Sequence, residues 1–184
     1  AILSPNPHNR QPWMVDLSTP DEVHLYVDTN RLLPHTDPFS RQIVIGLGCF
    51  LETLSMAAAE EGLATEMTLF PEGSDPERLD ARPVAVVRFR SGATPDPLLA
   101  YVPSRRTLKE PFDMTQNVAD DTLATILAAA HTTRCDGTNA PDQVAALRQL
   151  SRDALTLEIE TPHTYKESVD LFRIGRAEVN ANPD

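Results

Sequence analysis

The spacing of apolar residues predicts one long helix in the first half of the chain. The apolar positions recur every three or four residues, as one buried face of an α-helix requires; they are Ile43, Leu47, Phe50, Leu51, Leu54 and Ala58. Asp37 and Pro38 form a favourable helix start, because a carboxylate at the N-cap precedes a proline at the first helical position. Gly62 suits the C′ position that ends a helix. We therefore expect a long, well-buried helix between Asp37 and Gly62.

Two glycines fall inside this predicted helix. Gly46 and Gly48 should each weaken it by about 1 kcal/mol relative to alanine. A glycine in a helix is often explained by the close approach of another backbone. We therefore expect either a packed strand or a partner helix to lie against this part of the helix.

Apolar and β-branched segments predict three strands, at residues 23–27, 66–70 and 84–89. Between the last two, residues 71–83 are rich in proline, glycine and aspartate, which is typical of an exposed loop. A second loop, at residues 91–97, separates this mixed part from a mostly helical part. The pattern indicates a mixed α and β protein with a small sheet, and we place a boundary between residues 92 and 93.

The part after the boundary contains three apolar stripes with helical spacing. The first comprises Leu123, Ile126, Leu127 and Ala130; the second follows Pro141 and comprises Val144, Leu147, Leu150 and Ala154; the third comprises Tyr165, Val169 and Phe172. The third helix is predicted to start at Thr161 and Pro162 and to stop near Gly175.

Composition and charge narrow the function classes. The chain has 184 residues, 41% of them hydrophobic, which is enough for one domain or two small halves. Sixteen basic residues against 27 acidic ones give a net charge of −11, which disfavours nucleic acid and membrane surfaces as partners. Two distant cysteines exclude a disulfide scaffold and a zinc ribbon, and the five histidines lack metal-ligand spacing. We therefore expect no metal site.

Neither a signal peptide nor a bilayer span is expected in this chain. The first residues are followed at once by a polar, proline-rich segment, and the apolar stretch 43–59 is interrupted by glycine and polar residues. As it stands the chain is expected to be cytoplasmic. Its abrupt start and its turn-forming end favour a fragment of an exported or longer protein, so the location of the natural protein stays open.

The first candidate site is the segment from Ser4 to Trp13. Three prolines favour an extended backbone, while Asn6, Asn9 and Gln11 offer paired amide donors and acceptors, and Trp13 offers a flat apolar wall. This combination suits the polar edge of a planar heterocycle. The alternative is a proline-rich turn whose amides cap neighbouring backbone, which is the commoner use of such a segment.

The second candidate site is the segment from Ser104 to Asp113. It holds three of the sixteen basic residues, Arg105, Arg106 and Lys109, within five positions. Guanidinium, ammonium and hydroxyl groups are directional donors to phosphoryl oxygens. The alternative, equally compatible with the charges, is a solvated basic turn that neutralises nearby carboxylates.

These two segments resemble those of the nitroreductase-like flavoprotein family. The stretch 7–13 is similar to the family's Ser-x-x-Asn-x-Gln-Pro-Trp segment, and 105–109 is similar to its Arg-Arg-Ser/Thr-x-Arg/Lys segment. The later pattern, including Leu171 to Gly175, resembles a two-half subgroup whose members carry the name twin-arginine translocation pathway signal proteins. The resemblance implies an α+β fold, a nitroreductase-like sandwich with a central, mostly antiparallel sheet flanked by helices and a long buried central helix.

The resemblance also implies a division of the chain and a set of cofactor contacts. Residues 1–92 would form a first nitroreductase-like half, and residues 93–184 the mostly helical, truncated start of a second half. Arg105, Thr107 and Lys109 would contact the phosphate, ribityl chain or N1–C2 edge of FMN, whereas Asn9 and Gln11 would contact the pyrimidine edge of its ring.

The implied activity is an FMN-dependent oxidoreductase without a catalytic protein nucleophile. NAD(P)H would deliver hydride to the flavin, which would reduce a nitroaromatic or quinone-like small molecule, in a homodimer or in a pairing with a second half. One alternative is a non-catalytic relative that binds or sequesters flavin, or only dimerises. Another is an acidic interaction module without a ligand, which leaves the basic cluster at 105–109 unexplained.

Overall fold

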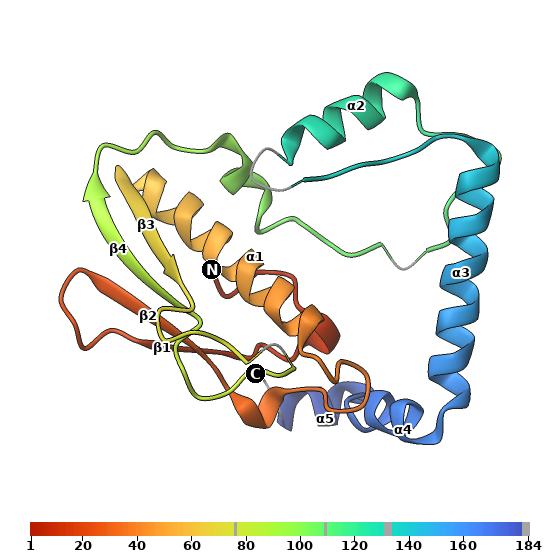
Figure 1. Ribbon diagram of the computed structural model, residues 1–184, viewed down its shortest axis with the longest axis horizontal. Helices are drawn as coiled ribbons and strands as arrows, with labels where there is room; N and C mark the ends of the chain where they lie inside the picture. Colours follow the sequence, from red (N-terminus) through yellow and green to blue (C-terminus); the bar gives the residue numbers. More distant parts are fainter. Residues whose placement is uncertain (76, 109, 131–133, 182–184) are drawn as a thin grey trace. The chain divides into compact units, whose positions relative to one another are not determined.

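Four strands form one antiparallel sheet in the computed structural model of the chain (Figure 1). The structure describes residues 1–75, 77–108, 110–130 and 134–181. The strands are β1 (Trp13–Asp16), β2 (Glu22–Val27), β3 (Leu63–Leu69) and β4 (Ala85–Ser91), and their order across the sheet is β1-β2-β4-β3. This architecture confirms the predicted α+β class with an antiparallel sheet, and it is consistent with a nitroreductase-like fold.

Three of the strands were expected and one was not. β2 and β4 lie close to the predicted bounds, and β3 begins three residues before its predicted start. β1 pairs with β2 from Trp13 opposite Val27 to Asp16 opposite His24. It is a four-residue edge strand with three exposed residues, so it lacks the alternation of buried and exposed positions by which a strand is predicted.

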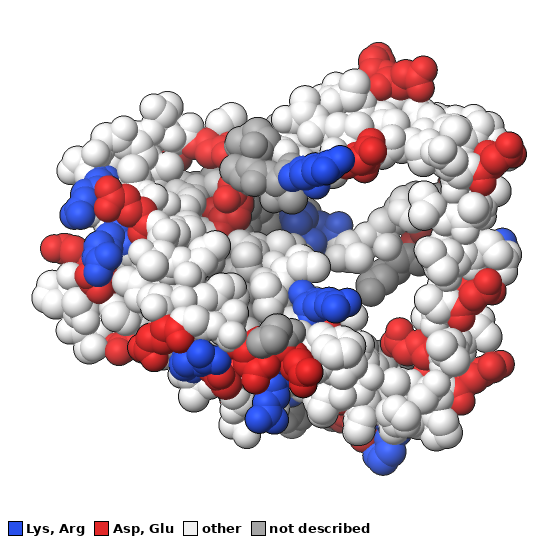
Figure 2. All heavy atoms as spheres, viewed as in Figure 1, with Lys and Arg blue, Asp and Glu red and all other residues white. Residues whose placement is uncertain are grey.

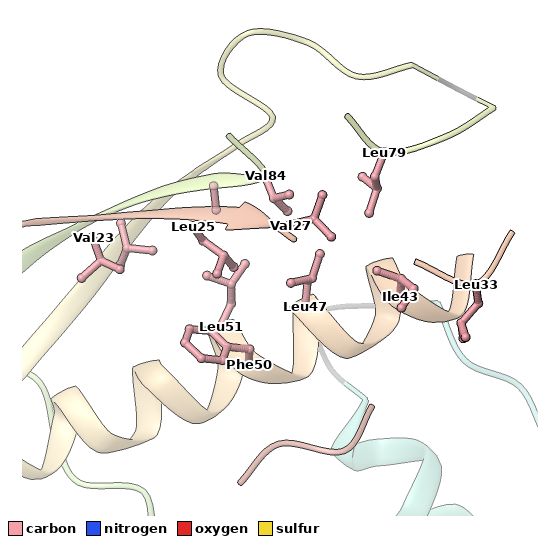
Figure 3. Packing of buried hydrophobic residues seen from close by; sticks show 12 residues of the cluster. Val23, Leu25, Val27, Leu33, Ile43, Leu47, Phe50, Leu51, Leu79 and Val84 are labelled. Atoms are coloured by element: carbon pink, nitrogen blue, oxygen red, sulfur yellow. The ribbon is translucent and has the colours of Figure 1, made fainter. Parts of the chain in front are cut away.

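The core lies between the sheet and helix α1 (Arg41–Glu60). In β2 every second residue is buried, so that Val23, Leu25 and Val27 face the helix (Figure 3). The helix packs its own buried face against these residues. Figure 3 shows this face, which comprises Ile43, Leu47, Phe50 and Leu51, pointing toward the strands. Burying one apolar side chain of this size contributes about 1.5–3 kcal/mol, so this layer is the main source of stability in this part of the chain.

Helix α1 is also long and apolar enough, by length and composition, to cross a membrane. Core helices of globular proteins meet the same criteria. Here its apolar face packs on the sheet, and the outward-facing Ile45 is 67% exposed.

The predicted start of α1 is wrong by three residues, although the predicted carboxylate, that of Asp37, still accepts a hydrogen bond from the first turn of the helix. The N-cap is Ser40, which has a left-handed backbone (φ 53°) and makes no side-chain cap bond. Asp37 acts from outside the helix instead, since its Oδ2 accepts a hydrogen bond from the Ile43 amide at 2.9 Å. The predicted end is confirmed, because Gly62 follows the C-cap with φ +74°.

The two glycines of α1 differ in what lies against them. A Cβ added to Gly46 would be 3.1 Å from Cβ and 3.3 Å from Cα of Asn6. The close neighbour is therefore the N-terminal segment, and the expected strand or partner helix is not what approaches. A Cβ added to Gly48 would meet no described atom within 4 Å. Only Gly46 is required by packing.

Chain contacts divide the molecule into two units. The first unit comprises Ala1–Arg106 and the stretch from Lys166 onward, and the second comprises Thr107–Tyr165. The predicted division of the chain at residues 92 and 93 concerns family halves, and it stays a prediction. The second unit holds α2 (Asp120–Ala129) and α3 (Pro141–Glu160), as the apolar stripes predict.

Helix α3 exposes its apolar stripe. Leu147, Leu150 and Leu157 are 56%, 65% and 69% exposed. The third predicted helix is shorter than expected, because α4 (Pro162–Asp170) ends before Gly175 and a separate helix, α5 (Gly175–Ala181), begins there.

Within the first unit, a carboxylate from α4 fixes the C-terminal stretch to residues 35 and 36. Glu167 accepts hydrogen bonds from the amides of His35 (3.1 Å) and Thr36 (2.7 Å) and from the Thr36 hydroxyl (2.7 Å). Burial acts to raise the pKa of Glu167, but the bonds from Thr36 and His35 outweigh it and the pKa lies below its ordinary value. The ionised carboxylate is therefore the form that holds this contact.

The two glycines give a matched pair of substitutions. Gly48→Ala is expected to stabilise the protein by about 1 kcal/mol, because alanine has the better helix propensity and the new methyl group meets open space. Gly46→Ala should lose most or all of that gain, because the methyl group presses on Asn6. Urea unfolding of both variants measures the difference. Equal gains would mean that the N-terminal segment does not lie on α1.

The Glu167 contact should weaken in acid. A lowered pKa in the folded protein means that the contact stabilises fully above the ordinary carboxyl pKa of 4.5 and is lost as the pH falls through the lowered value. Hydrogen exchange of the His35 and Thr36 amides, compared with Glu167→Gln at each pH, measures this. Protection relative to the variant should be large at pH 6 and should decrease as the pH falls below the ordinary carboxyl pKa of 4.5. Asp170→Asn, on the same helix, is the control, and a similar loss there would contradict the assignment.

Candidate functional site

The N-terminal segment has an unusual backbone. Its short 3₁₀ turn η1 (Pro7–Asn9) precedes Pro12, and three of its residues have positive φ: His8 at 49°, Asn9 at 51° and Gln11 at 47°. Positive φ is uncommon outside glycine, although asparagine and histidine adopt it more readily than most residues. A cluster of such residues is costly unless surrounding contacts enforce it, and such clusters concentrate at functional sites.

The side chain of Asn6 enforces this conformation. Its Oδ1 accepts a hydrogen bond from the Gln11 amide at 2.8 Å, and its Nδ2 donates to the Ser4 carbonyl at 3.2 Å. The buried Ser4 hydroxyl donates in turn to Thr53 Oγ1 of α1 at 2.9 Å. Asn6 is therefore bonded to neighbouring backbone, which is the alternative interpretation of the amides in this segment.

Reciprocal arginine contacts hold the other side of the segment. Arg10 donates from Nε to the Arg31 carbonyl and from Nη2 to the Asn30 carbonyl, both at 2.9 Å. Arg31 donates from Nη1 to the Arg10 carbonyl at 3.0 Å. Arg31 follows Asn30 in the turn η2 (Thr29–Arg31), whose N-cap Asp28 donates its amide to the Pro12 carbonyl at 2.7 Å. The segment is fixed at both ends.

Trp13 does not provide the flat wall that the sequence suggests. Its ring packs on Phe50 of α1, with centroids 5.2 Å apart and planes at 35°. The side chain is half-buried and packs against the core cluster. The expectation that Trp13 offers a free face to a heterocycle is therefore wrong, because the ring is used in packing.

The two predicted amides of the site, Asn9 and Gln11, differ in burial and in their relation to a pocket. Asn9 is exposed and lines a pocket of about 200 Å³, and its side chain forms no hydrogen bond with the described residues. Gln11 is half-buried and does not line this pocket. The residues that line it are His8, Asn9, Arg10, Arg31, Leu171, Phe172 and Arg173.

The predicted basic residues do not line this pocket. Arg105 follows the turn η3 (Pro97–Tyr101), donates its amide to the Tyr101 carbonyl at 2.9 Å and has an exposed side chain. Thr107 belongs to the second unit, and Lys109 lies outside the described residues. The cofactor contacts assigned to these three residues stay predictions.

The pocket adds cations that the sequence analysis did not single out as site residues. Arg10 stands in the pentad at residues 9–13 that resembles the family's motif, but Arg31 and Arg173 are 21 and 163 positions further along the chain. Arg173 lies six residues beyond Glu167, whose hydrogen bonds attach this stretch to residues 35 and 36. No spacing rule links residues that meet only through the tertiary fold.

A second, larger pocket does not contain any predicted site residue. It measures about 380 Å³ at the start of α1, and its lining combines apolar side chains, among them Phe39 (52% exposed) and Ile45 (67% exposed), with the polar and charged residues Arg41, Ser74, Asp75 and Arg78. Arg41 lies over the Phe39 ring, 5.0 Å from its centroid. Across the described part of the chain, no three His, Cys, Asp or Glu side chains are grouped as a metal site would need.

Comparison with known proteins gives distant relatives. No family model matches the chain. It is 30% identical over 116 residues to "Uncharacterized protein Rv3127" of Mycobacterium tuberculosis, a match that covers 61% of this chain and 33% of that protein. It is also 30% identical over 116 residues to "Putative NAD(P)H nitroreductase acg" of the same organism, covering 61% of this chain and 35% of the relative.

A further relative from Mycobacterium tuberculosis, "Putative NAD(P)H nitroreductase Rv3131", is 28% identical over 107 residues, which are 58% of this chain and 30% of that protein. The chain spans about a third of the length of the curated relatives that it matches. The names of these relatives support the resemblance to nitroreductases. The chain is a distant relative of proteins that carry the name "Putative NAD(P)H nitroreductase".

Proposed function

We propose that this chain forms part of an FMN-dependent oxidoreductase of the nitroreductase type. One observation carries the proposal: the amide of Asn9 is exposed at a pocket, on a backbone that Asn6 and Arg10 hold in a costly conformation. A side chain held in this way is preorganised for a ligand. The names of the distant relatives support the same activity.

The donors of the site suit two parts of FMN. An amide both donates and accepts, as the pyrimidine edge of the flavin requires, and guanidinium groups suit its phosphate. A pocket of about 200 Å³ takes part of such a molecule, since whole cofactors occupy roughly 300–1,000 Å³. The described residues fit an edge and an anionic group of FMN, and the rest of its surface would have to be covered by other parts of the protein.

The division of labour follows from the side chains. When bound, FMN supplies the hydride and electron transfer chemistry, with NAD(P)H as the donor and a nitroaromatic or quinone-like molecule as the acceptor. Asn9 and Gln11 orient the ring, and a cation near its N1–C2 edge stabilises the negative charge that develops on reduction. In this proposal Arg105, Thr107 and Lys109 supply that cation or contact the ribityl chain. No protein nucleophile is needed.

The chain is also proposed to pair with a second half or a second copy. Helix α3 supports this, because an isolated helix in water is marginally stable and the leucines of α3 are more than half exposed. Such pairing is compatible both with the oxidoreductase and with the alternative function, a relative that binds or sequesters flavin without turnover. We also propose that the chain belongs to the two-half subgroup whose members carry the name twin-arginine translocation pathway signal proteins.

An absorption experiment separates the two functions. Purified protein supplemented with FMN is expected to retain a yellow flavin spectrum after desalting and to bleach when NADPH or NADH is added without oxygen. Retained flavin that does not bleach would favour sequestration. Absence of retained flavin would contradict both functions for this chain.

Asn9→Ala tests the orientation of the flavin ring. Loss of a neutral hydrogen bond should weaken FMN binding by only about 0.5–1.5 kcal/mol. The reduction midpoint of bound FMN should shift, because the charge of the ring edge changes on reduction. Spectroelectrochemical titration measures the midpoint, and Asn117→Ala, at an exposed position of the second unit, is the control. An unchanged midpoint in Asn9→Ala would contradict the role.

A further inference from the structure

The larger pocket lies within the first unit, between the start of α1 and the loop that follows β3. It measures about 380 Å³, which is within the range of small-molecule sites. Both elements supply its apolar lining: Phe39, Val44 and Ile45 come from the start of the helix, and Phe70 and Leu79 from the loop. Leu79 is 8% exposed and points toward α1 (Figure 3), whereas Phe39 and Ile45 are more than half exposed. The pocket therefore joins the edge of the core to exposed apolar side chains.

The backbone on both sides of this pocket is left-handed. Ser40, next to Phe39, has φ 53°, and Phe70 has φ 46°. Such a conformation is an outlier for a bulky residue and persists only where other contacts enforce it. Two hydrogen bonds do so at Phe70, whose amide donates to the Val84 carbonyl and whose carbonyl accepts from the Gly73 amide, both at 2.8 Å. The backbone that carries this aromatic ring is therefore fixed in a costly conformation.

Two guanidinium groups accompany the apolar lining, those of Arg41 and Arg78. Among the residues that the structure describes, these two arginines form no hydrogen bond or ion pair. Arg41 lies over the Phe39 ring, 5.0 Å from its centroid. Stacking of this kind uses the face of the guanidinium and leaves the N–H groups at its edge for an acceptor.

The carboxylates near these guanidinium groups are bound to other groups. Asp80 is within electrostatic range of Arg78, but it accepts a hydrogen bond from Arg82 Nη2 at 2.7 Å, and the hydrogen bonds from Arg82 lower the pKa of Asp80 to about 2. Asp75, the carboxylate in the lining, accepts a hydrogen bond from the Glu77 amide at 2.8 Å. With Asp75 counted, the lining carries two positive charges and one negative charge, so it suits a single negative charge on a ligand.

The lining favours a carboxylate with an apolar body. The edge of a guanidinium matches a carboxylate, because two parallel N–H groups can donate to its two oxygens. The rings of Phe39 and Phe70 can pack on an aromatic body. A phosphate group would bring nearly two negative charges and no apolar surface, and a neutral apolar molecule would leave the guanidinium edges without an acceptor.

We propose that this pocket binds a small organic carboxylate with an aromatic body, whose carboxylate is bound by Arg41 and Arg78. Its aromatic body packs against the apolar lining. The pocket is a second site, because the residues that line it include none of the predicted flavin contacts. The inference therefore does not rest on the proposed function.

Titration with three probes, followed by NMR, tests the pocket. Phenylbutyrate has both parts of the proposed ligand, phenylbutyramide lacks the negative charge, and butyrate lacks the ring. The backbone amide signals of isotope-labelled protein report both the affinity and the place of binding. No flavin is added, so the result does not depend on whether this chain binds FMN.

Matched variants separate the contribution of charge from that of apolar contact. Arg78→Gln removes a lining cation, Arg78→Lys keeps the charge without the fork, and Ile45→Gln removes an apolar side chain. Arg90→Gln and Met14→Gln are the controls, since both residues are exposed in the same unit and do not line the pocket. Circular dichroism and the unfolding midpoint of each variant confirm that it folds.

Phenylbutyrate is expected to bind wild-type protein about tenfold or more tightly than either of the other probes. The amides of Ile45 and Ser74, at the pocket, should shift. Arg78→Gln and Ile45→Gln should each weaken phenylbutyrate binding several-fold, and Arg78→Lys should weaken it less than Arg78→Gln. The two control variants should bind phenylbutyrate as tightly as the wild-type protein.

Four results would overturn the proposal. Equal binding of phenylbutyrate and phenylbutyramide would mean that the guanidinium groups are not used. Equal weakening by Arg78→Gln and Arg90→Gln would mean that only the overall charge matters. Shifts at residues 8–10 in place of Ile45 and Ser74 would assign the carboxylate to the smaller pocket. Absence of binding would mean that the pocket takes no such ligand. Each of these results leaves the proposed function intact, because retention of FMN is measured separately.

Discussion

The close contact between Asn6 and Gly46 positions the N-terminal segment of the candidate site on helix α1. Gly46 lies on the buried face of α1, and the core beneath it is fixed by the packing of that helix on β2. With hydrogen in place of a side chain, the helix lets the backbone of Asn6 approach to within van der Waals contact. Asn6 then sets the conformation of Gln11 through a single hydrogen bond. The conformation of the segment that carries Asn9 therefore depends on how α1 packs in the core.

Local pattern predicted those elements whose burial is regular. Helix α1 and strand β2 each bury residues at a constant interval, so the sequence reveals them. Strand β1 is held by its pairing with β2, and three of its four residues are exposed, so no pattern marks it. The start of α1 was misplaced for a related reason, since Asp37 caps the helix from three residues before the N-cap.

The candidate site was predictable in its amides and not in its cations. The pentad containing Asn9 and Gln11 is contiguous, so the sequence alone singles it out. Its neighbours were misjudged where tertiary packing decides their use, as for Trp13, whose ring packs on Phe50. Arg31 is placed at the pocket by the turn η2, and Arg173 by the hydrogen bonds of Glu167. Neither arrangement can be recognised from the spacing of residues in the sequence.

The net charge of the chain does not determine the electrostatics of an individual site. On the face shown in Figure 2, acidic side chains are spread over the surface with basic ones among them. At physiological ionic strength such charges are screened over about 8 Å, so the net charge of −11 bears on distant partners and leaves a pocket governed by its own lining. In the exposed turn, Arg106 Nη1 donates to the carbonyls of Pro103 (3.0 Å) and Arg105 (2.7 Å), which is how a solvated basic turn uses a guanidinium. Basic residues that adjoin in the sequence therefore do not by themselves show that a turn binds phosphate.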